Sequence, residues 1–389
     1  MKNLERTERY VGVEFVLGRT ASKRDDYVME KIGSIIRKDP LANVLVVVPP
    51  QATYITEKQL MHKLGLKGLM GAVVQSPARI CDRVLESTYG RTIPEIDSVG
   101  KSMILRLILD GEQEHLEALA KSARKSDVPM ELSGLIAELK TLDITPQMLL
   151  EIDTNHENTK KKLADIALLY ERFEEKTAGL FDTEDKINLV IEHIPEAEFL
   201  KGAHLVIHGF DIYNAQTVRF LKALMHAAKD TTMSFYYAQT NAPDSGVYEI
   251  CNENRNKFLQ DAIKMGLETT IITEDREISK DILHLEKNLY AYPARHKERA
   301  KDISVTSAPD VDEEVRAVAA QIVWLNRKYG YDYRDMAVVC GSGERYSPVI
   351  RRRFAEAGIP CFTGEKRTLA QCAFSMFLLT ALELAQGRL

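Results

Sequence analysis

The stretch Val11–Asp26 (VGVEFVLGRTASKRDD) constrains the fold most, because an apolar run meets a polar loop there and a helical pattern follows. The run Val13–Leu17 is short, largely apolar and ended by Gly18, which predicts a buried strand. From Tyr27 onwards, apolar side chains recur at the three- and four-residue spacing of a helix. A strand, a polar loop and a helix in this order are the context of a phosphate-binding loop, so the stretch predicts an α/β domain.

The loop departs from the Walker A pattern G-x-x-x-x-G-K-[ST] at three positions counted from Gly18. Lys23 stands where Gly lets the backbone approach a phosphate, and Arg24 replaces the compact Lys ammonium. Asp25 replaces the hydroxyl that would hold Mg²⁺, and its carboxylate repels a phosphate. We favour an ordinary strand-to-helix turn, with binding of ATP and Mg²⁺ as the alternative. The candidate nucleotide-binding residues of this degenerate loop are Gly18, Arg19, Thr20, Ala21, Ser22, Lys23, Arg24 and Asp25.

A second nucleotide motif is also altered. Phosphoryl transfer in a helicase needs an acidic residue at the end of a strand, where it positions Mg²⁺ and water. The strand predicted at Leu205–Ile207 ends instead in His208. A neutral imidazole does not replace a carboxylate on a hard cation that prefers oxygen ligands, so a buried or capping role is the alternative for this His. Two alterations in one site argue against ATP hydrolysis by this domain.

Composition excludes several classes of protein. The chain has 389 residues and a net charge of −5, which argues against a generally basic nucleic-acid coat but leaves room for a local basic groove. The five Cys residues are scattered without a C-x-x-C pair, and no His pair has metal-ligand spacing; we predict reduced thiols in the cytoplasm and no metal site. The charged N-terminus does not resemble a signal peptide, and no apolar run approaches 18 residues, so we expect no membrane span.

Strand and helix patterns alternate in the first hundred residues, which predicts a parallel sheet with ligands at the carboxyl ends of its strands. Further strands are predicted at Val44–Val48 and Ala72–Gln75, with helices at Gln51–Leu64 and from Pro77. From Ser98 onwards about a hundred residues show helical patterns without a convincing strand, which predicts an all-α insertion.

The sheet is predicted to resume after the insertion, with strands at Leu205–His208 and Thr231–Tyr237. Residues 239–300 are polar and are interpreted as a connector with one helix, Asn256–Met265. A second α/β unit is predicted after it, with strands at Ile303–Ser307 and Met336–Cys340 and a last helix at Ala373–Ala385. Because that unit is incomplete, we interpret the chain as part of a longer protein.

The motifs are collinear with those of one known family. Phe15–Lys23 is comparable with FLVGRSGSGK, Val48–Tyr54 with VPDQMTF, Val74–Leu85 with VFSFSRLAWRVL, His208–Thr217 with DGFxxFTPQE, Glu313–Ile322 and Gly330–Gly341 with AEVEGVAREI…GYRYRDIAVLVR, and Ile359–Thr368 with IPYFIDEKRSM. In their order and spacing these segments resemble the N-terminal half of AddB, the B subunit of the bacterial AddAB ATP-dependent helicase–nuclease. The similarity runs from residue 12 to the end of the chain.

The resemblance implies a RecA-like P-loop NTPase fold of the superfamily-one helicase type. Residues 1–97 and 200–300 would form domain 1A with its connector, 98–199 a helical 1B insertion, and 301–389 the truncated start of a second RecA-like domain, 2A. In this family the subunit is a helicase-like scaffold that reads the Chi sequence on single-stranded DNA beside an AddA-type helicase–nuclease subunit. An iron–sulfur cluster and a Mg²⁺-dependent nuclease site belong to a C-terminal domain that this sequence does not include. We therefore expect neither here.

Candidate DNA-binding residues follow the predicted strands. Gln51 and Thr53 come after the second strand, and Arg79 and Arg83 lie four residues apart on one helix face. Phe210 follows the fourth strand and is a candidate for stacking on a base. The resemblance adds weight to Gln51, Thr53, Arg79 and Phe210. For each residue alone, a solvated Arg or a packed Phe is the alternative.

Two departures from the family pattern bear on Chi reading. Pro77 and Asp82 stand where the family has aromatic residues, and the Asp82 carboxylate would repel a phosphate. We therefore predict general binding of DNA, single-stranded and double-stranded, with Chi recognition altered. Two rival interpretations stay open: an active ATP-binding helicase domain, and a purely structural module for subunit interaction.

Overall fold

The computed structural model describes residues 12–387 except 21, 90–92, 212, 240–241, 243, 275–277, 292, 294–298, 365–368 and 370–371. Contacts divide the chain into two units, Met1–Arg299 and Ala300–Leu389. Each unit has apolar cores of its own. The described part contains no helix that meets both the length and the apolarity that a bilayer crossing demands.

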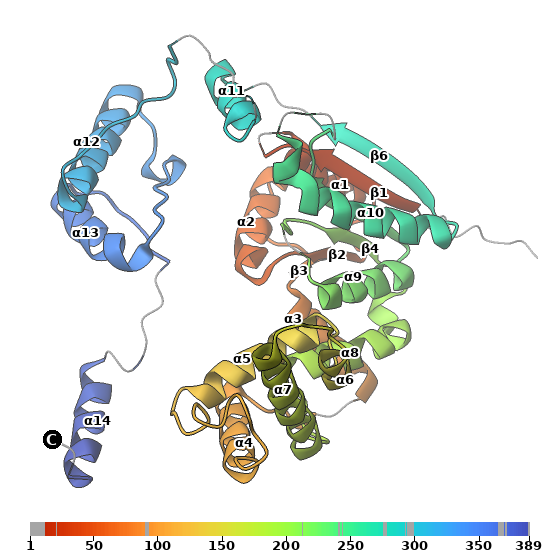
Figure 1. Cartoon of the computed structure of the whole chain (residues 1–389). Helices are drawn as coiled ribbons and strands as arrows, with labels where there is room; N and C mark the ends of the chain where they lie inside the picture. Colours follow the sequence, from red (N-terminus) through yellow and green to blue (C-terminus); the bar gives the residue numbers. More distant parts are fainter. Residues whose placement is uncertain are drawn as a thin grey trace, which may run out of the picture. The chain divides into compact units, whose positions relative to one another are not determined.

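The first unit is built on a six-stranded, all-parallel sheet with the order β3-β2-β4-β5-β1-β6 (Figure 1). The strands are β1 (Gly12–Gly18), β2 (Val44–Val47), β3 (Ala72–Gln75), β4 (His204–Ile207), β5 (Asp230–Tyr236) and β6 (Glu268–Glu274). β5 lies between β1, which leads into the degenerate loop, and β4, which ends before His208. One strand thus lies between β1 and β4, the two strands that lead into the altered nucleotide motifs, and this arrangement is consistent with a RecA-like sheet. All carboxyl ends lie at one edge, because the strands are parallel.

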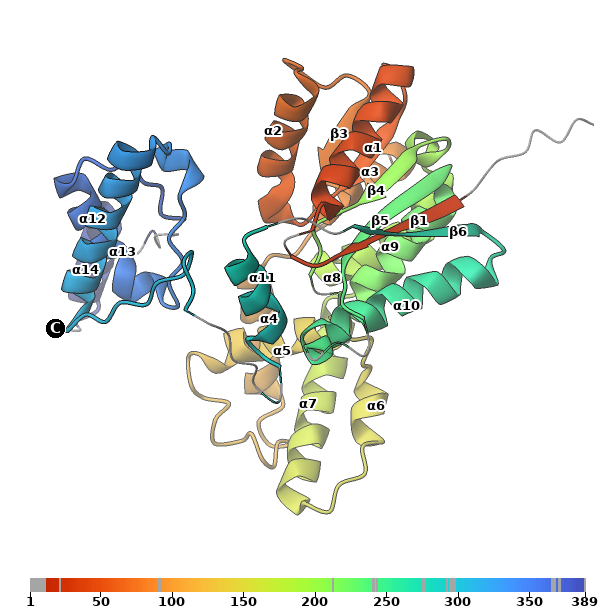
Figure 2. The same cartoon turned by 90° about the horizontal axis from the view of Figure 1, so that it is seen from above.

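Both faces of the sheet are covered by helices, which explains the nearly continuous apolar strand sequences (Figure 2). Alternate residues of β1 serve different cores: Val16 packs with α1 and α2, whereas Phe15 and Leu17 pack with the helices of the other face. The helices on the first face are α1 (Arg24–Lys38) and α2 (Thr53–Leu64), the latter preceded by the short 3₁₀ helix η1 (Pro50–Ala52). Those on the second face are α3 (Pro77–Tyr89), α8 (Thr183–His193), α9 (Ala215–Ala227) and α10 (Glu249–Lys264).

Residues 98–199, which the structure describes throughout, contribute helices and no strand to the sheet. They comprise α4 (Ser98–Gly111), α5 (Val128–Thr141), α6 (Pro146–Leu150), α7 (Glu157–Lys176), α8 and two 3₁₀ turns. Helices α4, α5 and α7 share an apolar core of their own around Leu105, Ile136 and Phe173. An ionic cluster ties this core to α8: Nζ of Lys140 lies 3.1 Å from Oδ2 of Asp182 and 2.9 Å from Oδ1 of Asp185.

The interpretation of 239–300 as a connector is wrong. This segment contains β6, which pairs with β1 along its whole length, and it contains α10 and α11 (Lys280–Asn288). Strand β6 has the sequence ETTIITE and lies at the edge of the sheet, where most of its side chains are exposed or half-buried. An edge strand needs no continuous apolar run, so the apolar signal of the other strands is missing here.

The two strands predicted in the second unit are also wrong. Segments 303–307 and 336–340 are described without pairing partners, and Val305 and Val339 are both 95% exposed. Apolar, β-branched sequences become strands only when a neighbouring strand accepts their hydrogen bonds, and the described residues offer none. The unit consists of α12 (Val311–Tyr329) packed on α13 (Gly343–Glu356) through a small core, together with α14 (Ala373–Ala385).

Candidate functional site

The loop that follows β1 is closed on itself. A Cβ atom at Gly18 would lie 2.0 Å from Oγ of Ser22 and 3.0 Å from the carbonyl oxygen of Glu274, so only glycine fits there. The backbone N–H of Ser22 donates to the carbonyl of Arg19 at 3.0 Å, and the N–H of Arg24 donates to Oγ of Ser22 at 3.3 Å. Two backbone N–H groups that a phosphate-binding loop would direct at its ligand, those of Ser22 and Arg24, are therefore used within this loop. Thr20 and Lys23 are exposed, and Ala21 lies outside the described residues.

Arg24, at the Walker A lysine position, turns inward from the first turn of α1. Its side chain is 3% exposed, its guanidinium carbon lies 3.7 Å from the centre of the Tyr236 ring, and its Nη2 lies 2.7 Å from Oδ1 of Asp25. Burial lowers the pKa of Arg24, but the Asp25 carboxylate and Tyr236 more than offset this and the pKa is raised. The cation at this position is satisfied by the protein's own carboxylate and aromatic ring.

His208, directly after β4, is a buried and neutral group. It is 7% exposed, and its Nδ1 lies 2.8 Å from Oγ of Ser234 on the adjacent strand β5. Its Nε2 lies 4.0 Å from Oδ1 of Asp25. Burial lowers the pKa of His208 to about 4, and the positive charge of Arg24 acts in the same direction against the opposing effect of Asp25. The site therefore presents a neutral imidazole at the position where phosphoryl transfer needs a carboxylate.

Arg19 ties the loop to the segment that follows β5. Its guanidinium forms an ion pair with Asp244, which is 3% exposed, and its Nε lies 3.3 Å from Oε2 of Glu286 in α11. It also lies 5.1 Å from the centre of the Tyr248 ring. Asp244, Tyr248 and Glu286 lie in residues 239–300, for which the sequence predicts a polar connector. The sequence alone therefore does not predict their contacts with Arg19. The positive charge of Arg19 is neutralised by the carboxylates of Asp244 and Glu286 and is not available to a ligand.

The residues of this site do not fit a magnesium–nucleotide group. Position 25 offers a carboxylate that is engaged by Arg24, and position 208 offers an imidazole that is engaged by Ser234. No cluster of three or more His, Cys, Asp or Glu side chains suited to a metal ion occurs in the described ranges. The five thiols are free.

The candidate DNA-binding residues follow three adjacent strands at the carboxyl edge of the sheet. Gln51 follows β2 and is exposed, and Thr53 begins α2, where its Oγ1 donates to the carbonyl of Pro50 at 3.1 Å. Arg79 lies in the first turn of α3 after β3; it is exposed and makes no ion pair with any residue that the structure describes. The sheet thus brings together residues that are distant in the sequence.

Arg83 and Phe210 are less available than these three. The guanidinium carbon of Arg83 lies 3.9 Å from the centre of the Phe199 ring. Phe210 is 8% exposed, and its ring centre lies 5.7 Å from that of Tyr213. Stacking of Phe210 on a base would require this side chain to leave the core. The negative charge of Asp82 is only partly compensated, because Nζ of Lys186 lies 2.6 Å from its Oδ1 and also 2.6 Å from Oε1 of Glu95.

Comparison with known proteins bears on this geometry. A family model described as "ADDB, N-terminal" matches residues 15–286, which span the sheet and the helical insertion. The chain belongs to the AddB family. AddB-family relatives, each named as the B subunit of an ATP-dependent helicase/deoxyribonuclease, include proteins of Alkaliphilus oremlandii, 33% identical over 390 residues, and Alkaliphilus metalliredigens, 31% identical over 387 residues. A relative of the same name from Acetivibrio thermocellus is 29% identical over 388 residues.

The three alignments cover 97%, 96% and 96% of this chain, in the same order, and 34% of each relative. The chain therefore spans about a third of the length of these AddB relatives. Both the degenerate loop and the DNA-binding candidates lie inside the family match, which begins within β1.

Proposed function

We propose that this chain is the helicase-like N-terminal region of an AddB-type subunit, and that it guides single-stranded DNA without hydrolysing ATP. An AddA-type partner would supply the motor, and the complex would process double-stranded DNA ends for recombinational repair in the cytoplasm. The family match and the relatives' name, which describes the B subunit of a helicase/deoxyribonuclease, support this proposal. An iron–sulfur cluster and nuclease Mg²⁺ would belong to the part of the parent beyond this chain.

The proposal assigns residues 1–97 and 200–300 to domain 1A, 98–199 to domain 1B and 301–389 to the start of domain 2A. The contact boundary between Arg299 and Ala300 is compatible with the last division. Within domain 1A, DNA would run along the carboxyl edge of the sheet, where parallel α/β sheets bind their ligands.

The proposed absence of ATP hydrolysis is supported by one observation. Arg24 is buried against Tyr236 and paired with Asp25, and the neutral His208 lies in the same site. A nucleotide would have to displace these contacts and would still lack a carboxylate for its metal ion. Titration calorimetry with ATP and Mg²⁺ tests this. We expect no heat of binding for the chain. Micromolar binding together with release of phosphate from ATP would refute the proposal in favour of an active ATPase.

A restored loop makes the calorimetry more informative. The variant Lys23→Gly, Arg24→Lys, Asp25→Thr rebuilds the Walker A pattern while leaving His208 in place. If binding appears only in this variant, the three substitutions are the cause of the loss. Hydrolysis should stay absent even then, because no carboxylate stands at position 208.

The DNA track depends on Arg79, the exposed cation among the candidates. Arg79→Ala should weaken binding of single-stranded DNA roughly threefold to tenfold at low salt and reduce the salt slope by about one. The matched control is Lys229→Ala, which removes an exposed cation just before β5, at the opposite edge of the sheet. Equal effects of the two substitutions would contradict the track, and absence of any DNA binding would favour a purely structural module.

Chi scanning is the finer part of the proposal. Gln51, Thr53 and Arg79 present two polar groups and one cation at neighbouring strand ends, as a single-strand reader requires. Proline at position 77 and the Asp82–Lys186 pair replace aromatic groups of the family pattern, so we propose that the sequence read here differs. Competition between oligonucleotides of different sequence against one labelled strand measures this preference.

A further inference from the structure

Three aromatic rings form a chain of contacts at the end of helix α12 in the second unit, two of them on the helix and Tyr331 just after it. Trp324, Tyr329 and Tyr331 are 45%, 53% and 50% exposed. The ring centres of Trp324 and Tyr329 are 5.4 Å apart at an interplanar angle of 79°, and those of Tyr329 and Tyr331 are 5.8 Å apart at 20°. The core face of the helix is a different one, built from Val315, Ala319 and Ile322. Half-exposed rings in a cluster are typical of a recognition surface.

The end of α12 holds these rings in place. Gly330 has a φ of 72°, the left-handed conformation that ends the helix, and its N–H donates to the carbonyl of Asn326. The chain then turns back, and Nδ2 of Asn326 donates to the carbonyl of Tyr331 at 2.8 Å. The helix end at Gly330 and the Asn326 side chain thus hold the backbone of Tyr331 close to Tyr329, where the two rings stack.

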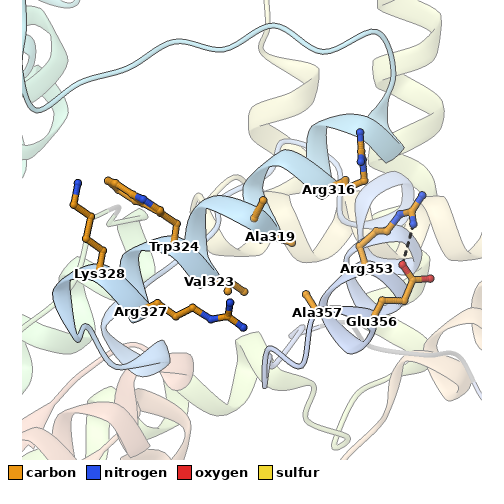
Figure 3. Close-up of a pocket in the computed structure, with 10 residues that line it drawn as sticks. Arg316, Ala319, Val323, Trp324, Arg327, Lys328, Arg353, Glu356 and Ala357 are labelled. Carbon is orange, nitrogen blue, oxygen red and sulfur yellow. Dashed lines mark hydrogen bonds and ion pairs between the residues drawn. The ribbon is translucent and has the colours of Figure 1, made fainter.

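Beside the rings lies an open groove of about 790 Å³ between α12 and the end of α13 (Figure 3). Its floor is made of small apolar side chains, Ala319, Val323 and Ala357, and Trp324 stands at one side. A flat apolar floor next to an aromatic wall can accommodate an unstacked base.

The groove is lined by cations. Of the ten lining residues, four are cationic (Arg316, Arg327, Lys328 and Arg353) and one, Glu356, is acidic. Arg316 and Arg353 form ion pairs with Glu313 and Asp312, respectively, and Arg353 also pairs with Glu356.

Two of these cations are not neutralised. Arg327 and Lys328 form no ion pair with any described residue. Nζ of Lys328 lies 4.5 Å from the centre of the Trp324 ring and 5.3 Å from that of Tyr329. The rings and the free positive charge are thus placed together, within a chain whose net charge is −5.

We propose that the α12 groove and the rings beside it bind single-stranded nucleic acid, with bases stacked on Trp324 in the groove and on Tyr329 beside it, and with phosphates held by Arg327 and Lys328. Aromatic platforms beside cations are what single-strand binding requires, since every base has a π-face and every nucleotide a phosphate. Duplex DNA fits less well because its bases are already stacked. This site is separate from the sheet edge of the first unit and does not rest on it.

Trp324 provides a direct test, because it is the only tryptophan in the sequence. Titration of the full chain with an oligothymidylate of about 16 nucleotides at about 50 mM salt should quench its fluorescence. The Arg327→Ala, Lys328→Ala double variant should weaken this binding at least fivefold and reduce its salt slope. The matched control, Arg334→Ala, removes an 83% exposed cation of the same unit outside the groove and should leave binding unchanged.

A labelled oligonucleotide followed by anisotropy allows the stacking itself to be tested. In a chain that also carries Arg79→Ala, which weakens the sheet edge, Trp324→Ala should weaken binding at least fivefold, whereas Trp324→Phe should retain most of it. Lys229→Ala, which removes an exposed cation outside both proposed DNA sites, should leave the tryptophan quenching unchanged. Absence of quenching in a folded chain, or equal losses for the groove and control variants, would overturn the proposal. Quenching by an AddA-type subunit without DNA would assign the groove to a protein interface and equally overturn it.

Discussion

The loop after β1 and the groove on α12 both place positively charged side chains next to aromatic rings, but the two regions differ in whether the protein neutralises those charges. In the loop, Arg19 and Arg24 lie over Tyr248 and Tyr236 and also pair with carboxylates. In the groove, Lys328 lies beside half-exposed rings, and neither Lys328 nor Arg327 has a carboxylate partner among the described residues. A cation at the position of a phosphate loop is thus no sign of an anion site when the protein supplies the anion.

The largest effect is expected for Arg19→Ala in the loop. It would leave Asp244 buried without its partner, which should cost about 3 kcal/mol of unfolding free energy. Urea unfolding followed by circular dichroism measures this, while Trp324 fluorescence follows the second unit in the same sample. If Arg19→Ala unfolds at the same urea concentration as the wild type, the ion pair between Arg19 and Asp244 does not stabilise the first unit.

The second-largest effect is the loss of unfolding free energy at acidic pH that is due to His208. The pKa of His208 is lowered by burial to about 4 from its ordinary value of 6.5, so the unfolded chain binds more protons between these values. Stability is therefore fully present above pH 6.5 and falls by about 2 kcal/mol between pH 7 and pH 5. Burial raises the pKa of Asp185 to about 6, which acts in the opposite direction in this window. The difference between wild type and His208→Asn isolates the histidine, and parallel pH profiles would refute its buried neutral state.

Arg24 and Arg327 provide a matched pair of substitutions. Arg24→Ala should cost about 1.5 kcal/mol, since the lost stacking on Tyr236 outweighs the relief of a buried charge. Arg327→Ala should leave stability unchanged and weaken only ligand binding. Thermal unfolding of both variants gives the comparison directly. Similar changes in melting temperature for Arg24→Ala and Arg327→Ala would mean that both cations stabilise the fold to the same extent, and would contradict the comparison.

The smallest effect is expected at Gly330. Gly330→Ala forces a side chain into the left-handed conformation and should cost the second unit about 1 kcal/mol. Because this residue positions Tyr331 on Tyr329, DNA-dependent quenching of Trp324 should also weaken. The control is Gly343→Ala in the first turn of α13, where a Cβ atom meets only Oγ of Ser347 at 4.0 Å. If Gly330→Ala loses stability but keeps full quenching, the conformation of the helix end is not needed for DNA binding at the groove.

Much of the first unit could be predicted from its sequence. Apolar runs such as Val44–Val47 identify central strands because both faces are buried, and the longer helices from α1 to α9 follow from apolar spacing, whereas the five-residue helix α6 is too short to show it. Strand β6 could not be found this way, since its edge position leaves it polar. In the second unit the same apolar pattern predicted two strands that have no partners among the described residues, because pairing is a tertiary property.

The candidate site was predictable in part. The three departures from the Walker A pattern and His208 could be seen in the sequence, as could the placement of Gln51 and Arg79 at strand ends. The inward turn of Arg24 and the pairing of Arg19 with Asp244, 225 residues away, depend on the folded chain. The burial of Phe210 is a similar case: its place after β4 indicated a ligand-facing position, but the aromatic cluster around Tyr213 holds it inside.

The pairing of β6 with β1 has a mechanical consequence. Seven residues of β6 run parallel to β1, from Gly12 beside Glu268 to Gly18 beside Glu274, and the chain continues from β6 towards the second unit. Tension on that continuation loads the whole ladder in shear, so that its bonds share the force instead of opening one at a time.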